Sequence, residues 1–134
     1  MDINYKKNGA AEINVMIKAA VDDGSRTAVV RGNYEIEDTI VIPSDFTLIL
    51  DGCRLRMADG TFCNMFTNAA RLSEKAHIPE GADHNIVIEG RGNVSLDGGN
   101  FNGLAERNHS KDGRPHISVN NMILFANVDG FRIT

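Results

Sequence analysis

Cysteine is scarce in this chain, which has only Cys53 and Cys63 among its 134 residues. Two cysteines cannot build the multi-disulfide framework of a small secreted domain, and neither stands in a Cys-x-x-Cys pair that would indicate a metal or redox site. We therefore interpret both as free, partly buried thiols. Zinc sites need closely spaced Cys and His pairs. The four histidines do not have such spacing; these histidines are His77, His84, His109 and His116. The sequence predicts no metal and no cofactor.

Long apolar runs and an excess of positive charge are missing as well. Charged or turn-forming residues interrupt every apolar stretch before it reaches the length of a membrane span, and residues 1–8 lack the apolar core of an export signal. The formal net charge is -4, which argues against binding to the phosphate backbone of nucleic acids. We therefore predict neither a membrane nor a nucleic-acid partner, with the cytoplasm as the default location.

One helical pattern is present near the N-terminus. Apolar residues recur there at three- and four-residue steps, as on one face of a helix; they are Ile13, Met16, Ile17, Ala20 and Val21. An Asp-Asp-Gly sequence ends the pattern, and its Gly24 suits the left-handed position after a helix. The sequence predicts an amphipathic helix from Ala10 to about Val21.

After residue 24 the apolar residues follow a period of two, which predicts β-strands. An apolar triplet followed by an acidic residue and glycine occupies residues 48–52 and again residues 86–90. An alternating segment that ends in Asp-Gly follows each of them, and residues 122–134 begin the cycle a third time. Such self-similarity between Gly and Asp turns is typical of a stacked β-solenoid.

The alternation at residues 53–57 assigns side chains to two faces of a strand. Cys53, Leu55 and Met57 are expected on the buried face, and Arg54 and Arg56 on the outer face. Several acidic residues in the repeat precede glycine, and Asp-Gly favours tight turns. We expect turn formation rather than catalysis from these residues, which are Asp51, Asp59, Glu89 and Asp97.

From this repeat we predict an all-β fold: a right-handed parallel β-helix, a single-stranded and incomplete solenoid with an N-terminal amphipathic capping helix. The helix would cover the unpaired backbone groups and the apolar interior of the first coil. The chain is expected to be one domain, with residues 1–24 as the N-terminal segment and helix and residues 25–134 as the first coils. Two stretches that break the repeat, about 62–83 and 99–121, are predicted to be excursions from the solenoid.

The order of these segments resembles a known family. The segments are Gly-x-Tyr at residues 32–34, Ile-Pro-Ser-Asp-Phe-Thr-Leu-Ile-Leu-Asp-Gly at 42–52, Asn-Ile-Val-Ile-Glu-Gly at 85–90, Leu-Asp-Gly-Gly at 96–99, Arg-Pro at 114–115 and Asn-Val-Asp-Gly-Phe-Arg-Ile at 127–133. Together they are similar to the opening of polygalacturonase-like proteins, glycoside hydrolase family 28 of the pectin-lyase-like fold. The resemblance spans nearly the whole chain.

The resemblance implies a hydrolase that cleaves a polysaccharide or oligosaccharide with inversion, using a general acid and a general base carboxylate. It also implies that the catalytic motifs lie on later coils, so no catalytic residue is predicted here and the chain alone is expected to be inactive. Two alternatives remain open: a non-enzymatic β-helix that serves as a binding or assembly module, and a calcium-dependent polysaccharide lyase. If the chain ends at Thr134, we expect self-association through the uncovered C-terminal coil.

The second predicted excursion carries the candidate binding residues. Acidic polysaccharides attract basic and amide donors, which predicts substrate binding at the rim of a sugar cleft by Asn102, Lys111, Arg114 and His116. The alternative is a solvated loop without a ligand.

Overall fold

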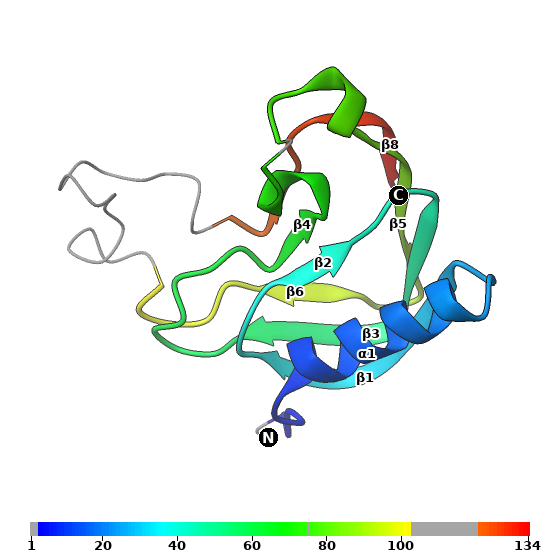
Figure 1. Cartoon of the computed structure of the whole chain (residues 1–134). Helices are drawn as coiled ribbons and strands as arrows, with labels where there is room; N and C mark the ends of the chain where they lie inside the picture. The colour runs from blue at the N-terminus through cyan, green and yellow to red at the C-terminus, as the bar shows by residue number, and fades with distance from the viewer. Residues whose placement is uncertain (1–2, 75, 103–120) are drawn as a thin grey trace, which may run out of the picture.

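The computed structural model describes residues 3–74, 76–102 and 121–134. One α-helix comes first and strands dominate the rest (Figure 1). The elements in chain order are α1 (Gly9–Asp22), β1 (Thr27–Ile36), β2 (Ile40–Ile42), β3 (Phe46–Met57), β4 (Phe66–Asn68), the 3-10 helices η1 (Ala70–Leu72) and η2 (Pro79–Gly81), β5 (Asp83–Arg91), β6 (Ser95–Asp97), β7 (Ile123–Leu124) and β8 (Val128–Ile133).

The strands form two parallel sheets. The larger one has the order β1-β3-β5-β8, with β6 paired to the second half of β3, and the smaller one has the order β2-β4-β7. Each long strand therefore lies beside the strand that occupies the same place in the next repeat of the chain. Apolar side chains come into register across the larger sheet: Phe46 lies opposite Ile86, which lies opposite Phe131.

The all-β, right-handed parallel β-helix that the sequence predicts is wrong. The chain is a mixed α/β structure, a helix with parallel strands in two sheets that do not close. In the described residues, the connection from β3 to β4 (residues 58–65) forms turns, and η1 and η2 follow β4. These segments build no further ladder that would join the two sheets into a coil.

The helix α1 packs against the first strand of each sheet and contributes to the core. It contacts β1 and β2, and its buried Ile13 and Ile17 lie in the same apolar cluster as the strand residues. The side chain of Asn14 bonds to the chain around β2: its Nδ2 donates to the carbonyl of Thr39 over 3.0 Å and its Oδ1 accepts from the N–H of Val41 over 3.0 Å. Helix and small sheet are thus tied together by one amide.

The first predicted excursion contains part of the core. Strand β4 lies inside it and pairs with both β2 and β7, and its residues Phe66, Thr67 and Asn68 are each 0% exposed. The core is formed by aliphatic and aromatic side chains from α1 and both sheets; the largest fully buried ones are Phe46, Phe66, Ile13, Ile36, Ile40, Ile42, Leu48, Leu50, Leu55, Met65, Ile86 and Val30. None of the helices in the described ranges has the length and apolar character needed to cross a membrane.

Candidate functional site

A buried polar cluster fixes the point at which β5 begins. Asp83 is only 8% exposed. Its carboxylate accepts hydrogen bonds from Ser44 Oγ (2.9 Å), Asn68 Nδ2 (2.9 Å) and the N–H of Ala70 (2.7 Å). The Oγ of Ser44 in turn accepts from the N–H of His84 over 2.9 Å. Because all these donors point at one carboxylate, the start of β5 is held firmly against β4.

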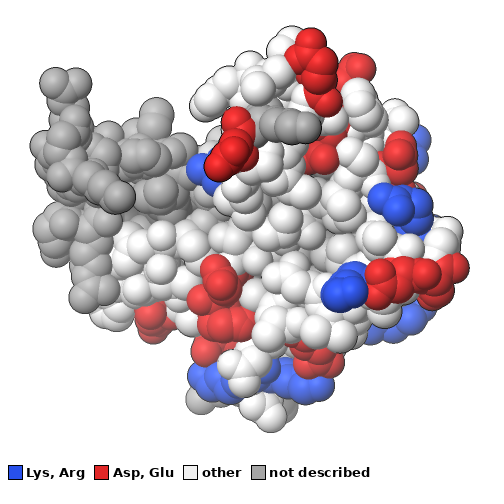
Figure 2. Space-filling model, viewed as in Figure 1, with Lys and Arg blue, Asp and Glu red and all other residues white. Residues whose placement is uncertain are grey.

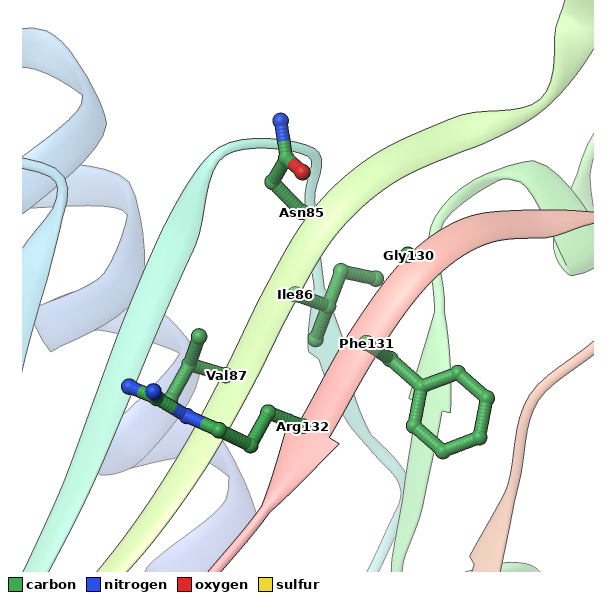
Figure 3. A pocket seen from close by; sticks show the side chains of 6 residues that line it. All are labelled: Asn85, Ile86, Val87, Gly130, Phe131 and Arg132. Carbon is green, nitrogen blue, oxygen red and sulfur yellow. The ribbon is translucent and has the colours of Figure 1, made fainter.

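A groove of about 370 Å³ lies on the neighbouring strands β5 and β8; it is lined by Asn85, Ile86, Val87, Gly130, Phe131 and Arg132. Figure 3 shows Phe131 and Arg132 leaving β8 on opposite sides. The ring of Phe131 meets the ring of Phe125 edge to face, with centroids 5.5 Å apart, and lies on the face of Ile86. Phe131 thus belongs to the apolar face, although 59% of it is exposed.

A second recess lies at the beginning of the same two strands, with a volume of about 430 Å³; it is lined by Pro79, Ala82, His84, Asn127, Val128 and Asp129. The Nδ1 of His84 lies 3.7 Å from Asp129 Oδ2, and the Asp129 side chain is 84% exposed. Residues 127–129 have the sequence Asn-Val-Asp. Among the described residues that line this recess, Asp129 is the only acidic one, whereas glycoside hydrolysis requires two carboxyl groups.

The outer face of the larger sheet carries charged side chains that are mostly paired. Arg31 Nε lies 3.1 Å from Asp51 Oδ2, and Arg91 Nε lies 2.7 Å from Glu89 Oε2. Exposed ion pairs of this kind contribute little to stability, but they neutralise the charge around them. On the face shown in Figure 2, acidic and basic side chains are likewise interspersed, without a broad area of one sign.

Two carboxylates of neighbouring turns lie beside one guanidinium. Arg56 Nη2 is 2.9 Å from Asp59 Oδ1, and Arg56 Nε is 3.8 Å from Asp97 Oδ2. The backbone N–H of Asn100 and then the guanidinium of Arg56 lower the pKa of Asp59 below its usual range. A general acid for glycoside cleavage needs a raised pKa so that it carries a proton at neutral pH. Asp59 is therefore poorly suited to that role.

The outer face also has an open polar recess of about 350 Å³, which is lined by Arg54, Gly92, Asn93, Val94 and Ser95. Arg54 on β3 and Ser95 on β6 are register partners, so both side chains lie on the outer face of the sheet. Both residues are exposed, as is Asn93. The recess thus brings a guanidinium, an amide and a hydroxyl group to one place.

The predicted faces of residues 53–57 are confirmed: Cys53, Leu55 and Met57 are buried, whereas Arg54 is exposed and Arg56 half-buried. The turns are only partly as expected. Asp59 lies in a turn, whereas Asp97 is the last residue of β6, where its Oδ1 accepts from the N–H of Gly99 over 2.9 Å. Asp51 and Glu89 instead lie inside β3 and β5.

Of the four predicted binding residues, only Asn102 lies in the described part of the chain. It is 5% exposed; its Nδ2 donates to the carbonyls of Ala58 (3.0 Å) and Gly98 (2.8 Å), and its Oδ1 accepts from the N–H of Phe62 (2.9 Å). These bonds give the amide a structural role. Lys111, Arg114 and His116 lie outside the described residues, so substrate binding by all four residues stays a prediction.

The chemistry of metal and thiol sites is absent from the described residues. They contain no group of three or more His, Cys, Asp or Glu side chains placed to hold a metal ion. Cys53 lies in the core, and its burial raises the pKa of its thiol to about 11, so the thiolate that would be needed for nucleophilic chemistry is not formed near neutral pH. Burial raises the pKa of Cys63 as well.

The recess at Arg54 was missed by sequence reasoning. Alternation placed Arg54 on the outer face, but nothing in the sequence indicates that Ser95 would be its neighbour, because that depends on the register between strands. Comparisons of the chain with models of protein families, with curated proteins and with solved structures found no match. Its function must therefore be inferred from its own residues.

Proposed function

We propose that this chain is part of a polysaccharide-degrading glycoside hydrolase, in which it contacts the sugar chain without supplying the catalytic carboxylates. The observation that carries the proposal is the recess at Arg54, Asn93 and Ser95, where three kinds of hydrogen-bonding side chain gather on an outer sheet face. Sugars present many hydroxyl groups, and a few converging donors and acceptors of this kind are what sugar recognition needs. The resemblance of the sequence to polygalacturonase-like proteins supports the same substrate class.

The acidic residues support a role in binding rather than in cleavage. An inverting hydrolase needs two carboxyl groups about 6.5–9.5 Å apart, one of them protonated, with room for water between them. Here Asp59 and Asp97 enclose the Arg56 guanidinium, and Asp129 is the lone acid of its recess. The catalytic pair of the intact enzyme is therefore expected outside the described part of this chain.

The proposal is tested by adding a panel of polysaccharides to the purified chain and measuring binding and reducing-end release side by side. We expect binding to at least one acidic polysaccharide, observed by isothermal titration calorimetry, and no release of reducing ends. A chain that binds no member of the panel would contradict the sugar-contacting role. Release of reducing ends that is abolished by Asp59→Asn or Asp129→Asn would show that the catalytic groups are here after all.

A second candidate function, an assembly module without catalysis, is favoured by the exposed residues of β8. Phe131 and Ile133 are 59% and 47% exposed, although their register partners Ile86 and Ile88 are buried. Light scattering distinguishes the two functions: concentration-dependent association that Phe131→Glu abolishes would favour assembly, and a monomer at all concentrations would exclude assembly through β8.

A further inference from the structure

We propose that Asp129 is a site of spontaneous covalent modification, at which the aspartyl residue of an Asp-Gly sequence isomerises to isoaspartate. Asp-Gly sequences are prone to this reaction because glycine has no side chain to shield its nitrogen or to restrict its backbone. The described part of the chain holds five of them, which begin at Asp23, Asp51, Asp59, Asp97 and Asp129, and a sixth, at residues 112–113, lies outside that part. The surroundings of the five differ, and they leave Asp129 alone unprotected.

The reaction needs only the atoms of the two residues and water. The backbone nitrogen of Gly130 attacks Cγ of the protonated Asp129 carboxyl group, an N–C bond forms, and the N–H proton and the carboxyl hydroxyl leave together as water. The product is a cyclic imide, a succinimide, to which water then adds. Opening at Cγ restores aspartate, whereas cleavage of the bond between the Gly130 nitrogen and the main-chain carbonyl carbon of Asp129 leaves the chain connected through the side chain as isoaspartate.

Three of the other four carboxylates are held by a nearby backbone N–H group. The bonds join Asp23 to Ser25 (2.8 Å), Asp59 to Asn100 (2.9 Å) and Asp97 to Gly99 (2.9 Å). These N–H groups are also the main cause of the lowered pKa of Asp23 and of Asp59, so both carboxyl groups are less readily protonated. A carboxylate that is bonded and ionised neither turns toward the following nitrogen nor loses water.

Asp51 is protected by an ion pair and by its place in the sheet. Its Oδ2 lies 3.1 Å from Arg31 Nε. It also lies inside β3, which pairs with β1 on one side and with β5 on the other. Closing a ring at Asp51 would disturb the ladders on both sides of the strand, and such central segments open least often.

Asp129 has none of these restraints in the part of the chain that the structure describes. Its side chain is 84% exposed, and the nearest charged group, His84 Nδ1, is 3.7 Å from Oδ2, beyond the length of a hydrogen bond. The carboxylate accepts no hydrogen bond from any other described residue. The space around it is therefore open for the rotation that brings Cγ to the nitrogen of Gly130.

The backbone at Gly130 is irregular as well. The ladder between β5 and β8 pairs His84 with Asp129 and then Ile86 with Phe131, and it skips the residues between them. The skipped residues, Asn85 and Gly130, lie side by side (Figure 3), and both have left-handed backbone, with φ of 54° and 83°. Interrupted ladders hold the strand less firmly than regular ones. Isomerisation here would add a carbon atom to the main chain, so the pairs that follow, Ile86 with Phe131 among them, would lose their register.

The experiment incubates the full chain in water enriched in heavy oxygen, both folded and in concentrated urea, and digests it in ordinary water. Each succinimide that opens takes up a heavy oxygen atom, which mass spectrometry locates, and electron-transfer dissociation distinguishes isoaspartate from aspartate. In the folded chain we expect uptake at Asp129 to be at least about tenfold faster than at the other four sites, and in urea we expect the five rates to agree within about threefold. Asp129→Glu is the matched control, because it keeps the charge but its longer side chain closes a ring far more slowly.

Each outcome either supports the site or overturns it. Uptake at Asp51, Asp59 or Asp97 of the folded chain as fast as at Asp129 would overturn the proposal, and so would uptake that persists in the same peptide of Asp129→Glu. A preference for Asp129 that is equally large in urea would show that the local sequence, rather than the fold, selects the site. None of these results depends on whether the chain binds a polysaccharide, so the proposed function can fail while this inference stands.

Discussion

Gly99 shows how a single residue without a side chain permits close packing of two neighbouring turns. Its backbone is left-handed, with φ of 68°, and a Cβ added to it would collide with the carbonyl oxygen of Met57. The hydrogen bond from the N–H of Gly99 to Asp97 holds it there. Glycine is therefore favoured at this position for two independent reasons: the left-handed backbone and the lack of space for a Cβ.

We predict that Gly99→Ala lowers the free energy of unfolding by at least about 2 kcal/mol, because it adds a collision to the left-handed strain. Gly24→Ala is the matched control: its φ is 80°, but nothing lies within 4 Å of the added Cβ, so only the conformational cost of about 1 kcal/mol is expected. Urea unfolding of both variants measures the difference. Equal destabilisation by the two substitutions would show that the approach of Met57 is not limiting.

Cys53 makes the stability of the chain depend on alkaline pH. Burial raises the pKa of its thiol from 9.0 to about 11, so the folded chain keeps the proton that the unfolded chain releases above pH 9. The contribution is fully present below pH 9 and is lost as the pH rises toward 11. Between pH 8 and pH 10 we expect a loss of about 1 kcal/mol in the free energy of unfolding.

The measurement compares urea unfolding of the natural chain and of Cys53→Ala at pH 8 and pH 10, because other groups titrate in the same range and cancel in the difference. The variant should be less stable at pH 8 and should recover part of the deficit at pH 10. A deficit that does not change with pH would contradict the assignment of the effect to Cys53.

At the scale of an element, α1 begins with an unusual cap. The residue before it, Asn8, makes no side-chain capping bond. A carboxylate from beyond β1 takes that place: Glu37 Oε1 accepts from the N–H of Ala10 over 2.6 Å and from the N–H of Ala11 over 3.2 Å. The negative charge also interacts favourably with the positive end of the helix dipole.

We predict that Glu37→Gln lowers the free energy of unfolding by about 1 kcal/mol, since an amide is a weaker acceptor for these N–H groups and removes the charge. Glu12→Gln is a suitable comparison, because Glu12 lies in the first turn of α1 but forms an exposed pair with Lys6. Its loss should change stability by less than about 0.5 kcal/mol. Thermal unfolding followed by circular dichroism checks both, and an equal effect would show that Glu37 acts only as a surface charge.

The helix was predictable, whereas the register of the strands was not. The predicted helix, from Ala10 to about Val21, agrees closely with the observed helix at Gly9–Asp22. The agreement is expected because the 3.6-residue period is a local property of the sequence. The repeated motif suggests that Leu48 pairs with Ile86, but Leu48 pairs with Ile88 and Phe46 with Ile86. A shift of two residues keeps every side chain on its own face, so periodicity cannot detect it. The recess at Arg54 depends in the same way on the register between β3 and β6, which places Arg54 opposite Ser95, and this register was not evident from the sequence either.

At the scale of the whole molecule, the sequence did not indicate whether the two sheets close into a coil. Repeated strands predict stacking, and the strands do stack in parallel. Whether stacked strands close into a coil depends on the connections, such as residues 58–65, and these have no periodic pattern to interpret. The two sheets are instead connected by buried polar groups, with Asp83 of β5 bonded to Asn68 of β4.

The side chain of Asn68 links the two sheets through hydrogen bonds. Its Nδ2 donates to Asp83 Oδ2 over 2.9 Å and to the carbonyl of Ala126 over 2.8 Å, while its Oδ1 accepts from the N–H of Ala126 over 3.0 Å. The residue is 0% exposed, so water cannot replace these bonds without opening the structure. Its removal would leave a buried carboxylate short of a donor.

We predict that Asn68→Ala and Asp83→Asn each lower the free energy of unfolding by about 2–3 kcal/mol, because each leaves buried polar groups without partners. The double variant should be destabilised by less than the sum, since each substitution removes the other's partner. Urea unfolding of the four chains completes the cycle, with Asn93→Ala as an exposed asparagine that should cost less than about 0.5 kcal/mol. Strict additivity would mean that the two residues act separately and would contradict a coupled role in joining the sheets.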